Sequence, residues 1–132
     1  MHLLHRSFHA TDGVFGFFLN GQNIALLPDG ITPVAINNVN GGNPLGSNAS
    51  NPAYYINNDL NDGGGAIDIE ADGLTVVLGA QAGLVSGVNH IKLAISDAGD
   101  SILDSWVFLE AGSFQCAPLT GIFPPFISLL KV

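Results

Sequence analysis

Residues 90–109, HIKLAISDAGDSILDSWVFL, carry the clearest strand pattern in the chain. HIKLAI alternates with a period of two, which is the period of side chains along a β-strand. The aliphatic side chains expected on one face of that strand are Ile91, Leu93 and Ile95. A second apolar run follows after a few turn-forming residues, so the stretch predicts two strands, 90–95 and 102–109.

The same kind of short run recurs in the rest of the chain, whereas helical periodicity is nearly absent. These runs are rich in β-branched and aromatic residues and are bounded by Gly, Asn, Pro or Asp. The further strands predicted in this way are 14–19, 23–27, 33–36, 53–56, 66–70 and 74–78. About eight short strands separated by turns are typical of an antiparallel two-sheet β-sandwich or jelly roll, with a closed barrel as the alternative. The sequence therefore predicts an all-β fold.

The chain of 132 residues is predicted to form a single β-sandwich domain, 1–132. Three parts of it differ in character: an atypical N-terminal segment (1–11), an Asn/Gly-rich region (37–65) and an apolar, Pro-containing tail (115–132). Asn and Gly favour turns and bury little, so the second part is expected to be mostly surface loop. Two adjacent prolines exclude a continuous helix from the tail, which must pack on its own domain or on a partner chain.

The charge balance restricts the partners of this protein. Eleven acidic residues against three basic ones give a formal net charge of -8, which repels phosphate backbones and argues against nucleic acid as a partner. Charged residues make up only 11% of the chain and hydrophobic residues 47%, so a homo-oligomer is expected to cover apolar surface. The single cysteine, Cys116, excludes a cysteine-rich zinc site. Divalent cations are the natural partners.

No run reaches the roughly 20 apolar residues that a bilayer span requires. The N-terminal MHLLHRSFHATDG is too short in its apolar part and too rich in histidine for a signal peptide. The sequence predicts no transmembrane segment, and the signal of an exported protein would lie outside it.

Three carboxylates, Asp97, Asp100 and Asp104, lie within ISDAGDSILDS. If Ala98-Gly99 forms the tip of a tight hairpin, Asp97 and Asp100 lie opposite each other across the ladder, where like charges destabilise. The same register directs Asp104 to the face shared with the aliphatic residues of 90–95. The other residues in that phase are Ile102, Trp106, Phe108 and Glu110.

A carboxylate near the core must be protonated, paired with a base or bound to a metal, because an isolated buried charge costs several kcal/mol. The only lysines and arginines are Arg6, Lys92 and Lys131, and the strand phase puts Lys92 on the opposite face. Oxygen ligands without clustered Cys or His favour Ca²⁺ over Zn²⁺, and Ca²⁺ needs roughly six to eight oxygens, so other turns are expected to contribute. The candidate metal ligands are Asp12, Asp72, Asp97, Asp100 and Asp104. A solvated or capped turn is the alternative interpretation.

Seven motifs occur in a recognisable order: DGVFGFFLNG, NIALLP, TPVAINNVN, NPAYYINN, ADGLTVVL, HIKLAISDAGDSILDS and VFLEAGSF. Together they resemble the bacterial choice-of-anchor L domain over about residues 12–114. The resemblance implies a β-sandwich of extracellular type, because proteins with that domain are typically exported and held at the cell surface by interchangeable C-terminal sorting signals. The five candidate aspartates match recurrent acidic positions of the family, which supports the calcium interpretation.

The chain departs from the family at both ends. Family members usually begin with a strand containing a Gly-Ser-Glu-Glu-Tyr-like motif, which MHLLHRSFHA lacks. A carboxylate ligand is then missing, and a sheet edge is expected to be open. The tail after Phe114 does not match either.

The histidines offer weaker candidates. His2, His5 and His9 have the spacing of one helical face, but they lie in a segment expected to be poorly ordered. His90 is the one catalytic candidate, as a general base near a metal, with a hydrogen-bonded strand histidine as the alternative.

Three functions are compatible with these features. The favoured one is a calcium-binding extracellular module for adhesion or for glycan or peptide binding. The second is a calcium-dependent hydrolase of a small ester or lactone, in which the metal polarises the carbonyl and activates water. The third is a structural spacer in a surface protein. The sequence leaves open whether any reaction is catalysed.

Overall fold

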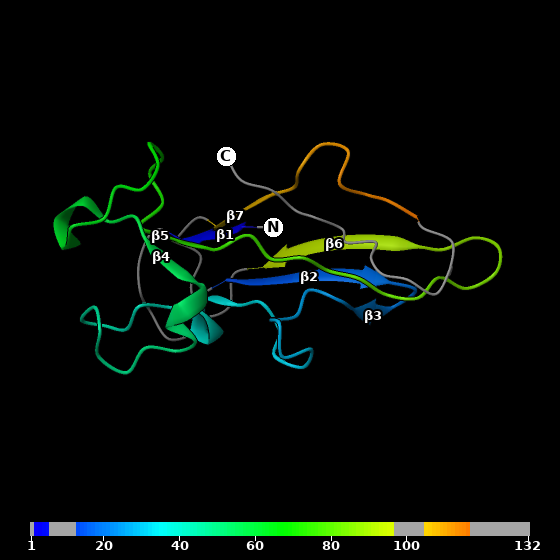
Figure 1. The fold of residues 1–132 in the computed structure, drawn as a ribbon, viewed down its shortest axis with the longest axis horizontal. Helices are drawn as coiled ribbons and strands as arrows, with labels where there is room; N and C mark the ends of the chain where they lie inside the picture. The colour runs from blue at the N-terminus through cyan, green and yellow to red at the C-terminus, as the bar shows by residue number, and fades with distance from the viewer. Residues whose placement is uncertain (1, 6–12, 97–104, 117–132) are drawn as a thin grey trace.

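The computed structural model describes residues 2–5, 13–96 and 105–116, which form two antiparallel β-sheets (Figure 1). The strands within these residues are β1 (His2–His5), β2 (Val14–Leu19), β3 (Gln22–Asn23), β4 (Tyr55–Asn57), β5 (Gly73–Thr75), β6 (Ile91–Ser96) and β7 (Ser105–Phe108). Three short 3₁₀ helices accompany them: η1 (Ile36–Asn38), η2 (Pro52–Tyr54) and η3 (Leu60–Asp62). The predicted all-β fold class is confirmed.

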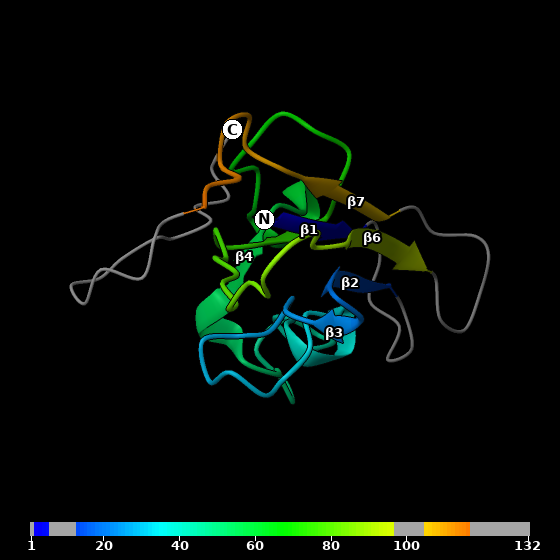
Figure 2. The same ribbon diagram turned by 90° about the vertical axis from the view of Figure 1, so that its right-hand side faces the viewer.

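The strands divide into a four-stranded sheet of order β4-β5-β1-β7 and a three-stranded sheet of order β3-β2-β6. The view turned by 90° separates β1 and β7 of the first sheet from β2 and β3 of the second (Figure 2). In the described part of the chain, no helix is both long enough and apolar enough to cross a membrane.

Strand β2 has its predicted bounds, because its run of β-branched and aromatic residues ends directly at a turn. Asn20 and Gly21 both have positive φ, 51° and 85°, which is the backbone that a tight hairpin turn between β2 and β3 requires. On the outer face, the Phe18 ring lies across Gly16, where a Cβ atom would collide with it. Lys92 of β6 places its ammonium 6.0 Å from the centre of that ring.

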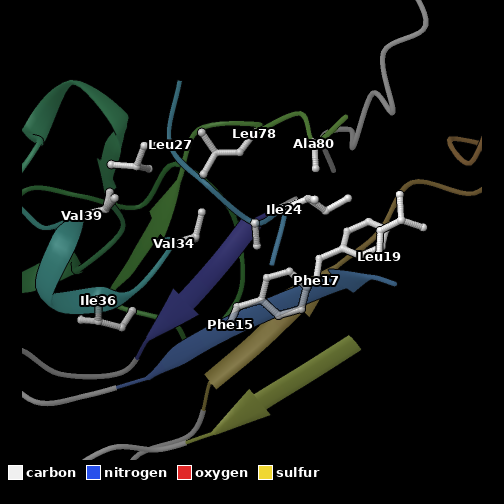
Figure 3. Packing of buried hydrophobic residues seen from close by; sticks show 11 residues of the cluster. Phe15, Phe17, Leu19, Ile24, Leu27, Val34, Ile36, Val39, Leu78 and Ala80 are labelled. Atoms are coloured by element: carbon white, nitrogen blue, oxygen red, sulfur yellow. The ribbon is translucent and has the colours of Figure 1, made fainter. Parts of the chain in front are cut away.

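The main core lies against the inner face of β2, where the large side chains are fully buried (Figure 3). Its members are Phe15, Phe17, Leu19, Ile24, Ala25, Leu27, Val34, Ile36, Val39, Leu78 and Ala80. Val107 of β7 and Leu109 just after it pack against this cluster, as does Tyr55 of β4. Both sheets therefore contribute to one core.

Two predicted strands are largely replaced by irregular backbone. In 23–27, only Asn23 lies in a strand, and its Oδ1 accepts hydrogen bonds from the N–H groups of Phe17 and Ala25, both at 3.1 Å. Because this side chain takes the place of ladder partners, the chain continues with only an isolated bridge between Leu26 and Pro33. The predicted strand 33–36 is likewise reduced to isolated bridges and then enters η1.

The remaining strand predictions have mixed outcomes. Those at 53–56, 74–78 and 90–95 overlap β4, β5 and β6, and 102–109 overlaps β7, although its residues 102–104 lie outside the described residues. The prediction of a strand at 66–70 is wrong, because this segment forms bends.

The predicted hairpin between the two C-terminal strands is also wrong. β6 pairs with β2, and β7 pairs with β1, so the two strands lie in different sheets. The expected tip, Ala98-Gly99, lies outside the described residues. The predicted phase of β7 is wrong too: Val107 packs on the core, whereas Trp106 and Phe108 are exposed. The predicted approach of Asp104 to the core required that phase, and Asp104 itself lies outside the described residues.

The N-terminal segment contains a strand that the sequence does not predict. Strand β1 pairs with β5 on one side and with β7 on the other. HLLH has no alternating pattern, so its strand conformation depends on partners distant in sequence. The helical spacing considered for His2, His5 and His9 does not apply to β1, and His9 lies outside the described residues.

Candidate functional site

Of the five predicted metal ligands, Asp72 is the one that the structure describes. It is partly buried and directly precedes β5, and its backbone carbonyl accepts a hydrogen bond of 2.8 Å from the N–H of Asn58. Asp12, Asp97, Asp100 and Asp104 lie outside the described residues. Their convergence with Asp72 stays a prediction. Over residues 2–5, 13–96 and 105–116, no three His, Cys, Asp or Glu side chains gather as a metal site would require.

Asp72 belongs to an acidic neighbourhood around Tyr55. The Tyr55 ring fits between Gly41 and Gly73, because a Cβ atom at either glycine would collide with the ring. Burial, followed by the negative charges of Asp72, Asp59 and Asp62, raises the pKa of Tyr55 to about 12. This part of the molecule therefore opposes the negative charge of a tyrosinate.

Helix η3 positions two of these carboxylates. Asp59 is its N-cap, and its Oδ1 accepts hydrogen bonds of 2.8 Å and 3.0 Å from the backbone N–H and the side-chain amide of Asn61. Gly63 ends the helix in the left-handed conformation, with φ of 77°. Asp62 lies in the first turn and is exposed. The turn is therefore fixed by its own polar groups.

Asn58 holds together the segment that follows η3. Its side chain is buried, accepts a hydrogen bond of 2.8 Å from Ile67 N–H, and donates to the carbonyls of Ala71 at 2.8 Å and Ile69 at 3.3 Å. The N–H of Ile67 and the carbonyl of Ile69 are backbone groups that a strand at 66–70 would have paired in a ladder. The side chain of Asn58 satisfies them instead, which explains why that predicted strand is absent.

Asn40 plays a similar part at the start of the Asn/Gly-rich region. Its Oδ1 accepts from the N–H groups of Gly42 and Ser50, both at 3.1 Å, and its Nδ2 donates to the carbonyl of Ile36 at 3.0 Å. The loop 41–49 thus has its two ends closed by one side chain. Asn51, with φ of 43°, donates to the carbonyl of Asn38 at 2.7 Å and fixes the approach to η2.

The surface of this loop region is partly apolar. Leu45 and Leu60 are both exposed, and Leu60 retains 81% of its accessible surface. Exposed asparagines, including Asn43, Asn48 and Asn61, lie among them. The loop region thus presents apolar and amide side chains to solvent from a backbone that its own polar groups hold in place.

His90, the catalytic candidate, is exposed and lies just before β6. Its backbone N–H donates to Oδ1 of Asn20 at 2.8 Å, and its carbonyl accepts from Asn20 N–H at 2.8 Å. These two hydrogen bonds join the end of β2 to the start of β6.

The sequence alone does not mark Asn40, Asn58 or Tyr55 as organising residues. The abundance of Asn in 37–65 is typical of surface loops with little burial. The signal that could have identified two of them is chemical: an Asn amide can accept from and donate to the backbone at once, and so replaces ladder partners. Nothing in the local sequence marks the glycines that accommodate Tyr55.

Comparison with known proteins gives one match. The family model described as the choice-of-anchor L domain matches residues 7–115, which is most of the chain. No curated protein matches. No solved structure matches either.

Proposed function

Because this chain belongs to the choice-of-anchor L domain family of surface-protein modules, we propose that it is an extracellular calcium-binding module for adhesion. The loop region 37–65 forms its binding surface and recognises a glycan or a peptide. The aspartates Asp12, Asp72, Asp97, Asp100 and Asp104 hold the calcium ion.

The observation that supports a binding surface most directly is the fixing of the loops by Asn40 and Asn58. The side chain of Asn40 makes four hydrogen bonds to backbone groups and that of Asn58 makes three, and both join segments that are separated along the chain. A loop that is ordered before it meets its ligand loses little conformational entropy on binding.

The argument for calcium is electrostatic. The chain carries a formal net charge of -8 with only three basic residues, so its carboxylates have few internal partners. Asp72, Asp59 and Asp62 already act together on Tyr55. Carboxylate and carbonyl oxygens from turns are the ligands that Ca²⁺ prefers.

A binding screen tests the surface. The full chain is applied to glycan and peptide arrays in calcium, and each hit is measured again with Leu60→Ser. The control is Ile31→Ser, because Ile31 is 78% exposed in a different loop and Leu60 81%. We expect Leu60→Ser to weaken binding at least about tenfold, which is about 1.4 kcal/mol, and Ile31→Ser to leave it unchanged. Equal effects of the two variants would rule out the loop region as the binding surface.

A thermal melt tests the metal. A calcium ion that binds the native state alone stabilises it by about 2.7 kcal/mol at a hundred times its dissociation constant, so Tm rises with calcium concentration and falls with chelator. Asp97→Asn and Asp100→Asn should abolish the rise. The control Asp29→Asn also removes one negative charge, but from a turn in which Asp29 accepts hydrogen bonds from Thr32 and Ile31. This variant should retain the rise of Tm with calcium.

The other outcomes identify the other functions. A Tm that ignores both calcium and chelator would contradict the metal proposal and, together with an empty binding screen, indicate a spacer. Turnover of an ester or lactone that disappears with chelator and with Asp100→Asn would indicate a hydrolase.

A further inference from the structure

The inner face of the three-stranded sheet continues from β2 onto β6. In the antiparallel register, Leu19 lies opposite Ile91, Phe17 opposite Leu93 and Phe15 opposite Ile95. Residues directly opposite each other in an antiparallel pair project from the same face of the sheet. The three aliphatic side chains of β6 therefore project to the side on which the core lies.

The two strands differ sharply in how that face is covered. The β2 side chains on it are at most 8% exposed, whereas those of Ile91, Leu93 and Ile95 are 42–53% exposed. None of the three belongs to the main core cluster, which lies over β2 (Figure 3). Ile91, Leu93 and Ile95 thus form an apolar strip on β6 that the described residues leave largely uncovered, next to the core over β2.

The chain itself returns to this face after β7. The ring of Phe114 packs on the ring of Phe17, with 5.7 Å between the ring centres and 54° between their planes. Phe17 is the residue that pairs with Leu93, so the chain at Phe114 already lies next to the uncovered strip. The described part of the chain ends at Cys116.

The residues that follow have the composition of a covering segment. Residues 117–132, APLTGIFPPFISLLKV, contain one charged side chain, Lys131, and no acid. Fully extended, they could reach about 50 Å, whereas the distance along β6 from Ile91 to Ile95 is only about 13 Å. Pro124-Pro125 favours an extended backbone, which can lie along a strand without being part of its ladder.

We propose that residues 117–132 fold back over β6 within the same chain and cover Ile91, Leu93 and Ile95. A second copy of the protein could cover the same strip. The chain's own segment is favoured because it begins beside Phe17 and is covalently attached, which gives it a high effective concentration at the strip. The family match ends at residue 115, so this cover is an addition to the part that the family model matches.

Disulfide cross-linking in the full chain tests this placement. In a Cys116→Ala background, Leu93→Cys is combined with one tail cysteine at a time: Phe123→Cys, Phe126→Cys or Leu129→Cys. The matched control replaces Leu93→Cys by Lys92→Cys, the neighbouring residue, whose side chain lies on the opposite face with Phe18. After mild oxidation, mass spectrometry distinguishes a cross-linked monomer from a cross-linked dimer.

We expect at least one tail position to give a cross-linked monomer about tenfold faster with Leu93→Cys than with Lys92→Cys. A cross-linked dimer as the main product would show that a second copy covers the strip and would overturn the proposal. Equal rates for the two strand positions would overturn it as well. If the variants do not fold, NOEs between Leu93 methyl groups and tail phenylalanine rings in the unmodified, dilute monomer decide the question: their presence supports the proposal, and their absence contradicts it.

Discussion

Strand β6 and the loop region 37–65 are held in place by different kinds of contact. β6 is fixed by a six-residue ladder with β2, yet its side chains on both faces are largely exposed. The loop region has almost no ladder, and the side chains of Asn40 and Asn58 fix its backbone instead. The difference shows that regular hydrogen bonding and burial are separate properties. A loop can be held by side-chain hydrogen bonds where a strand is held by its ladder, and each can keep exposed side chains.

The contrast also separates two sources of stability. The ladder of β6 depends on backbone groups that any sequence supplies, so single side chains there matter little to local order. The loops depend on two amides whose loss leaves buried backbone groups without partners. Substitutions in the loop region should therefore have the larger local effects.

The largest effect is expected at Asn58. Asn58→Ala removes two side-chain bonds to carbonyls and one to the N–H of Ile67; the bond to Ala71 is buried and the other two are partly buried. Because unsatisfied buried groups cost about 1–3 kcal/mol each and partly regain water, we expect a loss of about 3 kcal/mol in the free energy of unfolding, measured with urea. The control Asn61→Ala removes an exposed amide that bonds only to Asp59, and should cost about 0.5 kcal/mol. Similar losses in the two variants would contradict the role assigned to Asn58.

A pair of glycines gives the next effect. Gly42 and Gly46 both have φ of 87°, but a Cβ atom at Gly42 would overlap the backbone of Ser47, whereas Gly46 has open space around it. Both alanine variants carry the cost of positive φ, about 1 kcal/mol. Gly42→Ala should cost about 1 kcal/mol more, because the closed loop has to move. Equal urea midpoints would show that the loop is not held in this form.

The smallest effect concerns pH. The folded protein raises the pKa of Tyr55 from its ordinary value of 10.0 to about 12, so the stabilisation is complete below pH 10 and is lost as the pH rises through about 12. Because the ring is only partly buried, solvent screening should limit the loss to about 1 kcal/mol. The difference in unfolding free energy between the chain and Tyr55→Phe, measured from pH 9 to pH 12, isolates this contribution. A constant difference would contradict it.

Much of the fold could be predicted from local pattern. β2 has its predicted bounds because a run of β-branched and aromatic residues is followed directly by an Asn-Gly turn. The predicted strand 66–70 fails because Asn58, outside the segment, takes its backbone partners. β1 could not be predicted, because its ladder partners β5 and β7 lie far along the chain and HLLH has no periodicity of its own.

The candidate site was predictable in part. The acidic character of Asp72 and its surroundings follows from composition and turn position, and the structure adds Asp59 and Asp62 around Tyr55. The side chains of β7 that point to the core could not be predicted correctly, because the prediction required β6 and β7 to pair in one ladder. The two strands lie in different sheets. The pairing of strands depends on the packing of the whole domain. The spacing of residues within one segment carries no information about that packing.

The central claim is that the loop region is an ordered surface before any ligand binds. Amide hydrogen exchange of the unmodified chain, without ligand, tests it most directly at Ile67 and Ser50, whose N–H groups donate to Asn58 and Asn40. We predict exchange at least about a hundredfold slower than in an unstructured peptide. Exchange of both amides at the unstructured rate would contradict the claim.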